Sequence, residues 1–500
     1  SDGESASAEA VPVLELSIAD DLEGVWKHLA PPPVRVVRRA EGESRRKVIG
    51  TLTLERVRPY ESGAEERDDQ EIGGADPAHV HVKPLSRSYY APAVPIWEER
   101  HEISSSEIEL WRSDLVRPLA EIEPPMKALA VDGMTVEDPG YPLVEEVHLT
   151  LRLSPELPAD GAERMDLMKW FETSIPAGAG RAEVGWIGGV GDIMVARGIQ
   201  DILISREEGL SYIFDDTLPV LRGQDLLIGN LEGAVTTSGR RVEKSYNFRF
   251  RPEVLPRIGE AGFDYLSITN NHCYDYGEEG FIDTLENLEK YDLPTSGAGR
   301  TVDEAHEAAV LEIPYGGREA GQEAARVHVL SVAAYPRENN GFDGRTQARV
   351  SDTRAGIIFS GPEVLERIEA FSTEESIDVV AVHGGEEWKS YPTEEQRRFY
   401  RACVDAGAEL VLGSHPHVLQ GMEGYGGGII AYSLGNFLFP GMYVMEHAED
   451  SLILSVGFVE GRPLYVRPYP VRIDNRRISI DDTGGILARF LQLTKQLHDT

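Results

Sequence analysis

Short apolar runs alternate with segments of helical pattern over the second part of the chain. Two of the helical segments begin with the spacing of a capping box, Ser360-Gly-Pro-Glu363 and Thr393-Glu-Glu-Gln396. Strands that alternate with helices predict a layered α/β fold. The last two apolar runs, 452–458 and 464–471, have no helix between them and predict a hairpin. The other apolar runs, which we predict as strands, lie at 184–190, 225–229, 264–268, 327–333, 377–383, 410–413 and 429–432.

The first part of the chain is less regular. Alternating runs at 47–54 and 144–153 predict strands, and the small residues 174–182 predict a linker. The stretch 129–143 loosely resembles part of the solute-binding proteins of transport systems, which leaves a ligand-binding role open for this region. We therefore expect five parts: a loose segment 1–15, a smaller α+β domain 16–173, the linker 174–182, an α/β domain 183–480 and a C-terminal helix 481–500.

The net negative charge of the chain excludes some classes of binding partner. It has 85 acidic and 49 basic side chains among 500 residues, a formal net charge of −36. Such a chain repels nucleic acid and anionic lipid, so an anionic ligand requires local cations or a metal. The chain begins with Ser1 and has no apolar run that could span a membrane. We expect a removed leader and an extracytoplasmic location: secreted, periplasmic or at the cell surface. The two cysteines, Cys273 and Cys403, are expected to be buried free thiols.

Polar clusters follow five of the predicted strands, at the edge where α/β sheets bind ligands. Taken singly, each has a plain explanation, since a strand-end Asp is usually a turn residue and a lone His usually a loop residue. Together they form a set of nitrogen and oxygen ligands suited to Zn, Mn or Fe. The clusters are Gly189-Val-Gly-Asp192, Asn230-Leu-Glu232, Asn270-Asn-His272, His383-Gly-Gly-Glu-Glu-Trp388 and Gly413-Ser-His-Pro-His417.

Residues 184 to about 440 resemble the CapA-type proteins, which are linked to poly-γ-glutamate capsule synthesis and built like calcineurin-type metallophosphoesterases. The resemblance implies a layered, metallophosphoesterase-like β-sandwich flanked by helices, preceded by the smaller α+β domain. The motifs that carry it are Gly191-Asp-Ile-Met194, Gly229-Asn-Leu-Glu232, Asn270-Asn-His-Cys-Tyr-Asp-Tyr-Gly277, Gly297-Ala-Gly299, His383 with Glu387, Pro392 and Gln396, Gly413-Ser-His-Pro-His-Val418 and Tyr432-Ser-Leu-Gly-Asn-Phe437.

The same resemblance implies a site for two divalent metal ions. Asp192 and His417 would bind the first ion, Glu232 would bridge both ions, and Asn271, His383 and His415 would bind the second. His272 would be a catalytic residue that points at the substrate oxygen, and Asp275 either orients that imidazole or starts the turn at Gly277. Met194 stands where the superfamily has a further histidine.

Three functions follow as hypotheses. The first is a metal-dependent hydrolase acting on a phosphoester or a γ-glutamyl amide bond of an anionic small molecule or polymer, associated with the cell envelope. The second is a non-catalytic partner in the export or anchoring of such a polymer. The third gives the function to the N-terminal domain as a ligand-binding module. For Asn436, and for Glu386, Glu387, Trp388 and Tyr391, we favour structural roles over roles in the site.

Overall fold

The chain divides into two compact units in the computed structural model. Unit 1 comprises Ser1–Ala91, Ser104–Leu119 and Met134–Ala182, and unit 2 comprises Pro92–Ile103, Ala120–Gly133 and Glu183–Thr500. The domain limits expected from the sequence stay a prediction, and the expected linker 174–182 lies outside the described residues. The structure describes residues 11–19, 22, 32, 35–38, 46–57, 80–107, 115–138, 141–158, 161–173, 183–314, 324–338 and 341–499.

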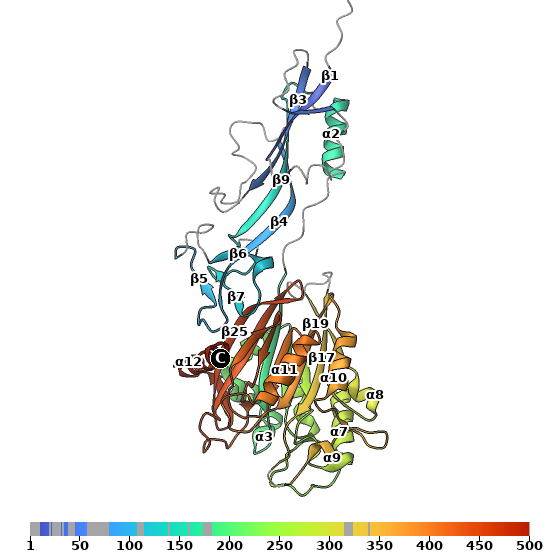
Figure 1. Ribbon diagram of the computed structural model, residues 1–500, viewed down its shortest axis with the longest axis vertical. Coiled ribbons are helices and arrows are strands. Elements are labelled where there is room, and N and C mark those ends of the chain that lie inside the picture. The colour runs from blue at the N-terminus through green and yellow to red at the C-terminus, as the bar shows by residue number, and fades with distance from the viewer. Residues whose placement is uncertain are drawn as a thin grey trace, which may run out of the picture. The chain divides into compact units, whose positions relative to one another are not determined.

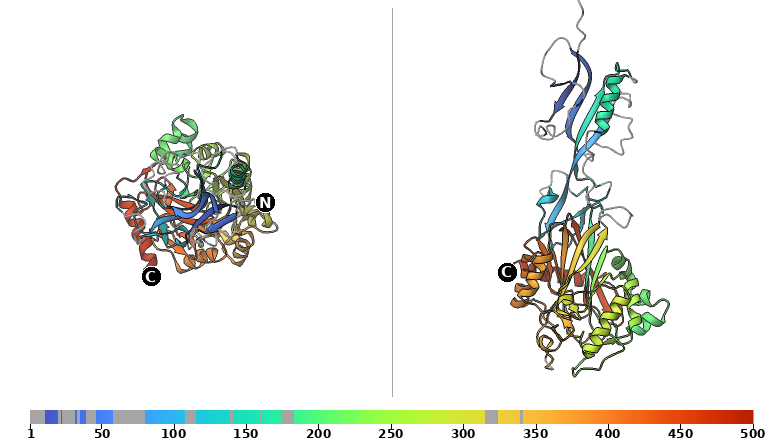
Figure 2. Two further views of the ribbon diagram at one scale, coloured as in Figure 1. Left: turned by 90° about the horizontal axis from the view of Figure 1, so that it is seen from above. Right: turned by 90° about the vertical axis from the view of Figure 1, so that its right-hand side faces the viewer.

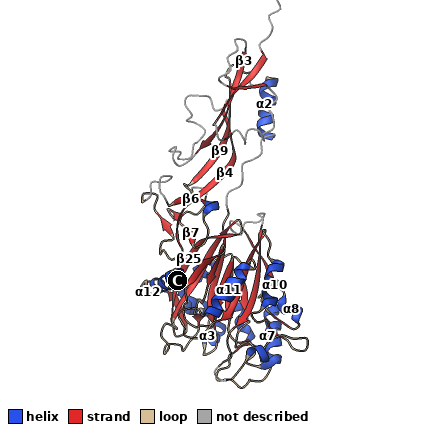
Figure 3. Cartoon of the chain, viewed as in Figure 1, coloured by secondary structure: helices blue, strands red, loops and turns tan. Residues whose placement is uncertain are grey.

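Unit 1 is built on a sheet of parallel and antiparallel pairs, with a helix beside it (Figure 3). Alternation along β3 and β9 places leucines such as Leu52, Leu54 and Leu151 on one face, where they pack against Trp170 and Phe171 of the helix. The strands predicted at 47–54 and 144–153 are therefore confirmed, whereas residues 11–15, expected to be loose, belong to a strand. The elements are β1 (Val11–Ile18), β2 (Arg35–Arg38), β3 (Arg46–Val57), β4 (Val80–Pro95), β6 (Val116–Pro118), β9 (Val144–Leu153) and α2 (Ala162–Thr173).

Two sheets form the centre of unit 2 (Figure 1). In the first sheet the order is β14 (Tyr265–Ser267), β11 (Leu226–Leu231), β10 (Gly185–Ile193), β24 (Asp450–Val459), β25 (Arg462–Asp474) and β26 (Arg477–Ile480), with β23 (Asn436–Leu438) also paired to β10. In the second sheet the order is β16 (Ala309–Pro314), β17 (Ala324–Ala334), β19 (Ser376–Gly384), β20 (Leu410–Ser414), β22 (Gly428–Ala431) and β21 (Met422–Tyr425).

Helices cover the outer faces of these sheets, as Figure 2 shows from a second side. The helices of unit 2 are α3 (Ile199–Ser205), α4 (Gly209–Phe214), α5 (Leu218–Arg222), α6 (Leu255–Glu260), α7 (Gly277–Lys290), α8 (Val302–His306), α9 (Gly344–Gln347), α10 (Pro362–Phe371), α11 (Glu394–Asp405) and α12 (Gly485–His498). The short strands are β5 (Glu102–Ile103), β7 (Met126–Ala128), β8 (Ala130–Val131), β12 (Ala234–Val235), β13 (Arg249–Phe250), β15 (Ala298–Gly299) and β18 (Gly356–Ile357).

The layering follows from the twofold alternation of side chains along buried strands. On β11, Ile228 enters the core between the two sheets, and its neighbour Leu227 enters the core shared with α3, α6 and α7. On β19, Val379 faces the same central core, and Val380 packs with α10 and α11. Both faces of each sheet are thus apolar, and for this reason the strands are continuous hydrophobic runs in the sequence. The expected fold, a layered α/β sandwich flanked by helices, is confirmed.

Most local predictions in unit 2 hold. β24 and β25 form the expected antiparallel hairpin, Thr393 accepts a hydrogen bond from the Gln396 amide at the start of α11, and both cysteines are buried free thiols. The capping box expected at Ser360 is wrong. Gly361 is the residue that caps α10, because Pro362 at the first helical position supplies the helical φ and needs no hydrogen bond for its nitrogen. Among the described residues, no helix combines the length and the hydropathy needed to cross a membrane.

Candidate metal centre

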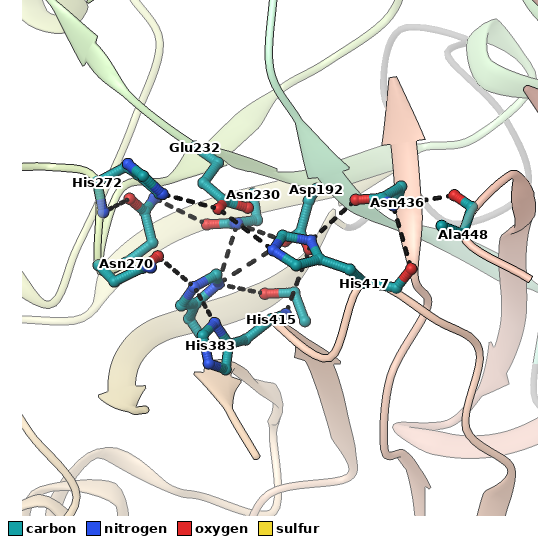
Figure 4. A network of polar contacts seen from close by, with 12 residues as sticks. Asp192, Asn230, Glu232, Asn270, His272, His383, His415, His417, Asn436 and Ala448 are labelled. Atoms are coloured by element: carbon teal, nitrogen blue, oxygen red, sulfur yellow. Dashed lines mark hydrogen bonds and ion pairs between the residues drawn. The ribbon is translucent and has the colours of Figure 1, made fainter. Parts of the chain in front are cut away.

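The polar clusters at the five strand ends meet at one place in unit 2 (Figure 4). β10, β11 and β14 are mutually parallel and bring Asp192, Glu232 and the 270–272 segment to one edge of the first sheet. β19 and β20 are parallel neighbours in the second sheet and bring His383, His415 and His417 to the same place. The carboxyl ends of strands from both sheets therefore form the site. All six residues predicted as metal ligands are buried, and His417 is the most exposed at 4%.

Asp192, Glu232 and His417 form a first group. His417 Nδ1 lies 3.1 Å from Asp192 Oδ2, and His417 Nε2 lies 3.9 Å from Glu232 Oε1. The two carboxylates and His383 also approach closely enough that one atom of each lies within 4.8 Å of the others, a spacing that suits a bound metal ion.

Asn271, His383 and His415 form a second group beside the first. His383 Nε2 lies 3.1 Å from Asn271 Oδ1 and 3.1 Å from His415 Nδ1. His383 Nδ1 lies 3.7 Å from Asp192 Oδ1, so the two groups adjoin at this imidazole. The structure thus gathers the six residues in the two sets that the resemblance implies, and their roles as ligands stay a prediction.

The backbone around these side chains is unusual. His415 has a φ of 96° and His417 a φ of 58°, values that non-glycine residues seldom adopt. Two left-handed residues on either side of Pro416 bring both imidazoles into the site. The chain is also tightly packed beside Asp192, since a Cβ atom at Gly191 would lie 1.9 Å from the carbonyl oxygen of Gly435. Gly191 therefore permits β10 to approach the 435–436 backbone.

The pKa values of the ionisable groups in the site are shifted in directions that favour a bound cation. Both carboxylate oxygens of Glu232 are buried without a hydrogen-bond partner, and burial together with the Asp192 charge raises the pKa of Glu232 well above its ordinary value. Burial by itself would lower the pKa of His417, but the charges of Glu232 and Asp192 raise it to about 9. Burial lowers the pKa of His383 to about 3 and that of His415 well below its ordinary value. The neutral imidazoles of His383 and His415, beside a buried carboxylate that accepts no hydrogen bond, fit a divalent cation.

His272 and Asp275, predicted as catalytic, lie at the edge of the cluster. His272 Nδ1 is 2.7 Å from Asp275 Oδ2, and its Nε2 faces Glu232 Oε1 at 3.7 Å. Asp275 also accepts a hydrogen bond from the Phe248 amide and contacts Lys244 Nζ at 3.1 Å. Of the two roles considered for Asp275, its contacts favour orientation of the imidazole. Burial lowers the pKa of His272.

Several residues that support the site had no assigned role in the sequence analysis. Asn230 donates to Asp192 Oδ1 at 2.7 Å and contacts His383 Nδ1 at 3.2 Å. Lys244, which is buried, donates to the carbonyl oxygen of Asn271 at 2.6 Å. Asn230 could have been found from its motif, since it directly precedes Leu231 and Glu232. Lys244 lies in an irregular loop, and its sequence context carries no signal.

Asn436 and Met194 are two neighbours of the centre with opposite roles: the first holds a candidate ligand, and the second does not contribute to the site. Asn436 accepts from His417 Nδ1 at 2.9 Å and donates to the carbonyl oxygens of His417 and Ala448, so it orients the imidazole as well as the loop. Met194 is fully buried in the apolar core and brings no donor to the site.

The 386–391 segment agrees only in part with the structural roles that we favoured, since the charge of Glu387 acts on Glu232 and His417. Glu386 and Glu387 are exposed, and Tyr391 is 52% exposed. The Trp388 ring, however, lies 5.3 Å from the His417 ring, so this side chain covers one imidazole of the centre. A positive φ of 66° at Trp388 produces this orientation, and such a backbone conformation is not readable from residue type.

A buried cluster of Asp, Glu, Asn and His between the strand ends of a two-sheet sandwich places this chain in the class of layered α/β proteins with a candidate metal centre. Comparison with known proteins agrees: residues 187–441 match the family described as bacterial capsule synthesis protein PGA_cap, and the chain belongs to this family. All six candidate ligands lie within the matched residues. The match begins at residue 187, so the role of the N-terminal part stays a prediction.

Individual relatives agree with the family. The chain is 32% identical over 313 residues to the capsule biosynthesis protein CapA of Bacillus anthracis, covering 58% of this chain and 70% of that protein. It is 31% identical over 253 residues to the PGA biosynthesis protein CapA of Bacillus subtilis, covering 50% of this chain and 62% of that protein. Among solved structures, the calcineurin-like phosphoesterase YfkN from Bacillus subtilis is 11% identical over 63% of this chain and 98% of that one, with a TM-score of 0.36.

Proposed function

We propose that this chain is a metal-dependent hydrolase of the cell envelope that acts on an anionic substrate through a phosphoester or a γ-glutamyl amide bond. The observation that carries the proposal is that both oxygens of Glu232 are fully buried and accept no hydrogen bond, although Asp192 and several imidazoles surround them. A buried carboxylate that accepts no hydrogen bond is costly unless a cation binds to it. Membership of a capsule synthesis family supports a polymer substrate and an extracytoplasmic location.

The residues divide naturally between two ions. Asp192, Glu232 and His417 would hold one, and Asn271, His383 and His415 the other, with Glu232 between them. Two divalent cations, Mn, Zn or Fe, would supply an acidified water and positive charge for the oxygens of the attacked group. Asn230 and Asn436 fix the ligand side chains by hydrogen bonds, as the surroundings of metal sites commonly do.

His272 is positioned to donate a proton to the leaving oxygen. In its neutral form, Nδ1–H donates to Asp275, and Nε2 faces the cluster beside Glu232. When protonated, the imidazole can donate from Nε2 while Asp275 stabilises its charge. Lys244, held against Asp275 and the Asn271 carbonyl, keeps this carboxylate in place.

A count of bound metal together with turnover tests the proposal. Purified protein loaded with Mn²⁺ or Zn²⁺ should hold two ions per chain and hydrolyse a chromogenic phosphodiester or a γ-linked glutamate oligomer. The His417→Ala variant should lose the first ion, because this imidazole contacts both carboxylates of that group. A protein that binds no metal, and whose stability is unaffected by chelator, contradicts the proposal.

We expect the His272→Ala variant to keep its metal content and lose turnover. General acid catalysis by one positioned side chain contributes roughly 10²–10⁴-fold, so kcat should fall within that range. The Asp275→Asn variant should lower kcat less and shift the pH dependence of kcat, since it weakens the partner of Nδ1 without removing the imidazole. Metal analysis and steady-state kinetics check both. A His272→Ala variant with unchanged kcat contradicts the role assigned to this residue.

Metal binding should release protons. His417, with a pKa of about 9 in the metal-free protein, is protonated at neutral pH and must become neutral to bind a cation. The raised pKa of Glu232 acts in the same direction, so the apparent metal affinity should rise with pH up to about 9. Titration calorimetry of Zn²⁺ into metal-free protein, in two buffers of different ionisation enthalpy, measures the release. Equal heats in the two buffers would show that none occurs.

The alternative is a non-catalytic partner in export or anchoring of the polymer. One observation favours it: Met194 is buried in the apolar core, so the superfamily histidine has no substitute at that position. A chain of this kind would bind at most one ion and would not hydrolyse either substrate. The metal count and turnover described above separate the two functions.

A further inference from the structure

One cation lies beside the candidate centre without a role in it. Arg197 follows β10 by a few residues and is exposed. Its φ of 53°, followed by a φ of 92° at Gly198, places two successive residues in the left-handed region before α3 begins. This backbone is unusual for a residue with a side chain, which indicates that tertiary contacts hold Arg197 in place.

The guanidinium of Arg197 is held against the loop that follows β23. Its Nη1 donates to the carbonyl oxygen of Pro440 at 2.6 Å. A Cβ atom added to Gly441, which has a φ of 85°, would lie 2.9 Å from the same nitrogen. The absence of a side chain at Gly441 therefore provides the space in which the guanidinium sits.

Two aromatic rings connect the guanidinium to the centre. Arg197 Cζ lies 5.5 Å from the ring centroid of Phe248 and 5.9 Å from that of Phe439. The Phe248 ring lies 4.3 Å from the His272 ring, and the Phe439 ring lies 5.2 Å from the His417 ring. The Phe248 ring thus lies between the guanidinium and His272, which we propose for proton transfer. The Phe439 ring lies between the guanidinium and His417, which we propose as a metal ligand.

The charge of Arg197 has no counterpart in the part of the chain that the structure describes, where no carboxylate pairs with it. Some arginines of the same unit do have such partners, since Arg251 pairs with Asp201 at 2.7 Å and Arg477 with Asp215 at 2.5 Å. In a chain with a net charge of −36, an arginine without an acidic partner beside the centre is notable. A guanidinium has five N–H donors in a planar fork that suits carboxylate and phosphate oxygens.

We propose that Arg197 determines the specificity of the centre by binding an anionic oxygen group, a carboxylate or a phosphate, that the substrate carries next to the attacked bond. The rings of Phe248 and Phe439 exclude water from one side of the guanidinium and so strengthen its interaction with the anion. The proposal rests on the proposed function for the reaction, but it concerns binding and is tested as binding.

The test measures equilibrium binding of two probes to Mn²⁺-loaded protein: a γ-linked glutamate oligomer and inorganic phosphate. The Arg197→Ala variant should bind at least one of them roughly 10-fold more weakly or worse, with metal content unchanged, and Arg197→Lys should restore part of the affinity. A loss for the oligomer alone identifies a carboxylate, and a loss for phosphate alone identifies a phosphate. Arg206→Ala is the matched control, because this exposed arginine also lies over a ring, that of Tyr212, but contacts no residue of the centre.

Three results would overturn the proposal: affinity of Arg197→Ala equal to that of the unmodified protein, an equal loss for an oligomer whose carboxylates are converted to amides, or an unmodified protein that binds neither probe. Failure of the proposed function has a different signature. In that case the unmodified protein would not hydrolyse its substrates, while the effect of Arg197→Ala on binding would persist.

Discussion

The Glu232→Gln variant is expected to be more stable than the unmodified protein when metal-free, and to gain no stability from added metal. In the metal-free chain both oxygens of Glu232 are buried without a hydrogen-bond partner, next to the Asp192 carboxylate. Replacing the carboxylate by an amide of the same shape removes a buried charge that accepts no hydrogen bond, which should raise the free energy of unfolding by about 1–3 kcal/mol at neutral pH. The same change removes a proposed bridging ligand. Thermal unfolding with and without Mn²⁺ measures both effects.

The pH dependence of this difference has a defined sign. A carboxyl group whose pKa is raised in the folded state holds its proton more tightly there than in the unfolded chain, so its contribution to stability is lost as pH rises through the folded pKa. The advantage of Glu232→Gln should therefore vanish below about pH 4.5, the ordinary value for Glu, and be greatest above the raised pKa of the folded state.

Glu423→Gln is the matched control for this prediction. Glu423 is 5% exposed, but Arg401 Nε donates to it at 3.1 Å and the Tyr432 hydroxyl at 2.6 Å. Its charge is satisfied, and removing it should lower stability and leave the metal response intact. If Glu232→Gln also lowers the stability of metal-free protein, then the contact of the carboxylate with the charged His417 imidazole satisfies it without a metal ion, and the cation site is misassigned.

The sequence predicted the strands of unit 2 well because buried strands leave a strong signal. β11 and β19 are apolar on both faces, so each is a continuous hydrophobic run that ends in a polar cluster. The polar clusters at the ends of these runs also identified the candidate ligands, since Asp192, Glu232 and His383 each lie at or just beyond the end of a strand. Parallel pairing then brings those ends together, a consequence of topology that needs no knowledge of side-chain contacts.

The remaining features depend on contacts between residues far apart in the chain. Lys244 meets Asp275, and Arg197 meets Pro440, across loops whose course no local pattern specifies. Trp388 reaches His417 only because its backbone is left-handed. The error at Ser360 has a local cause: both Ser360 and Gly361 can precede a helix, and the position of Pro362 decided between them. Contacts between distant residues and left-handed backbone conformations therefore could not be predicted from the sequence.

The His383→Ala variant is expected to lose at least one metal ion and, with it, turnover. His383 contacts Asn271, His415 and Asp192, so its imidazole belongs to both groups of the centre. Removal of a side chain that merely supports a ligand typically costs about 10–100-fold in metal affinity, so loss of a ligand should cost at least about 100-fold. We expect no more than one ion per chain, and kcat reduced by roughly 10³-fold or more, since each proposed ion would stabilise charge in the reaction.

His328→Ala separates this effect from damage to the fold. His328 is 8% exposed, lies on β17 next to β19, and contacts Asp378 Oδ1 at 2.8 Å through its Nδ1. It stands five residues along the paired strands from the position of His383, about 17 Å away, so it lies outside the centre. Both variants leave a polar neighbour without its partner and should lower the free energy of unfolding by about 1–3 kcal/mol. Only His383→Ala should release metal. Loss of metal from both variants would mean that the centre depends on the integrity of β17 and β19 rather than on the imidazole of His383.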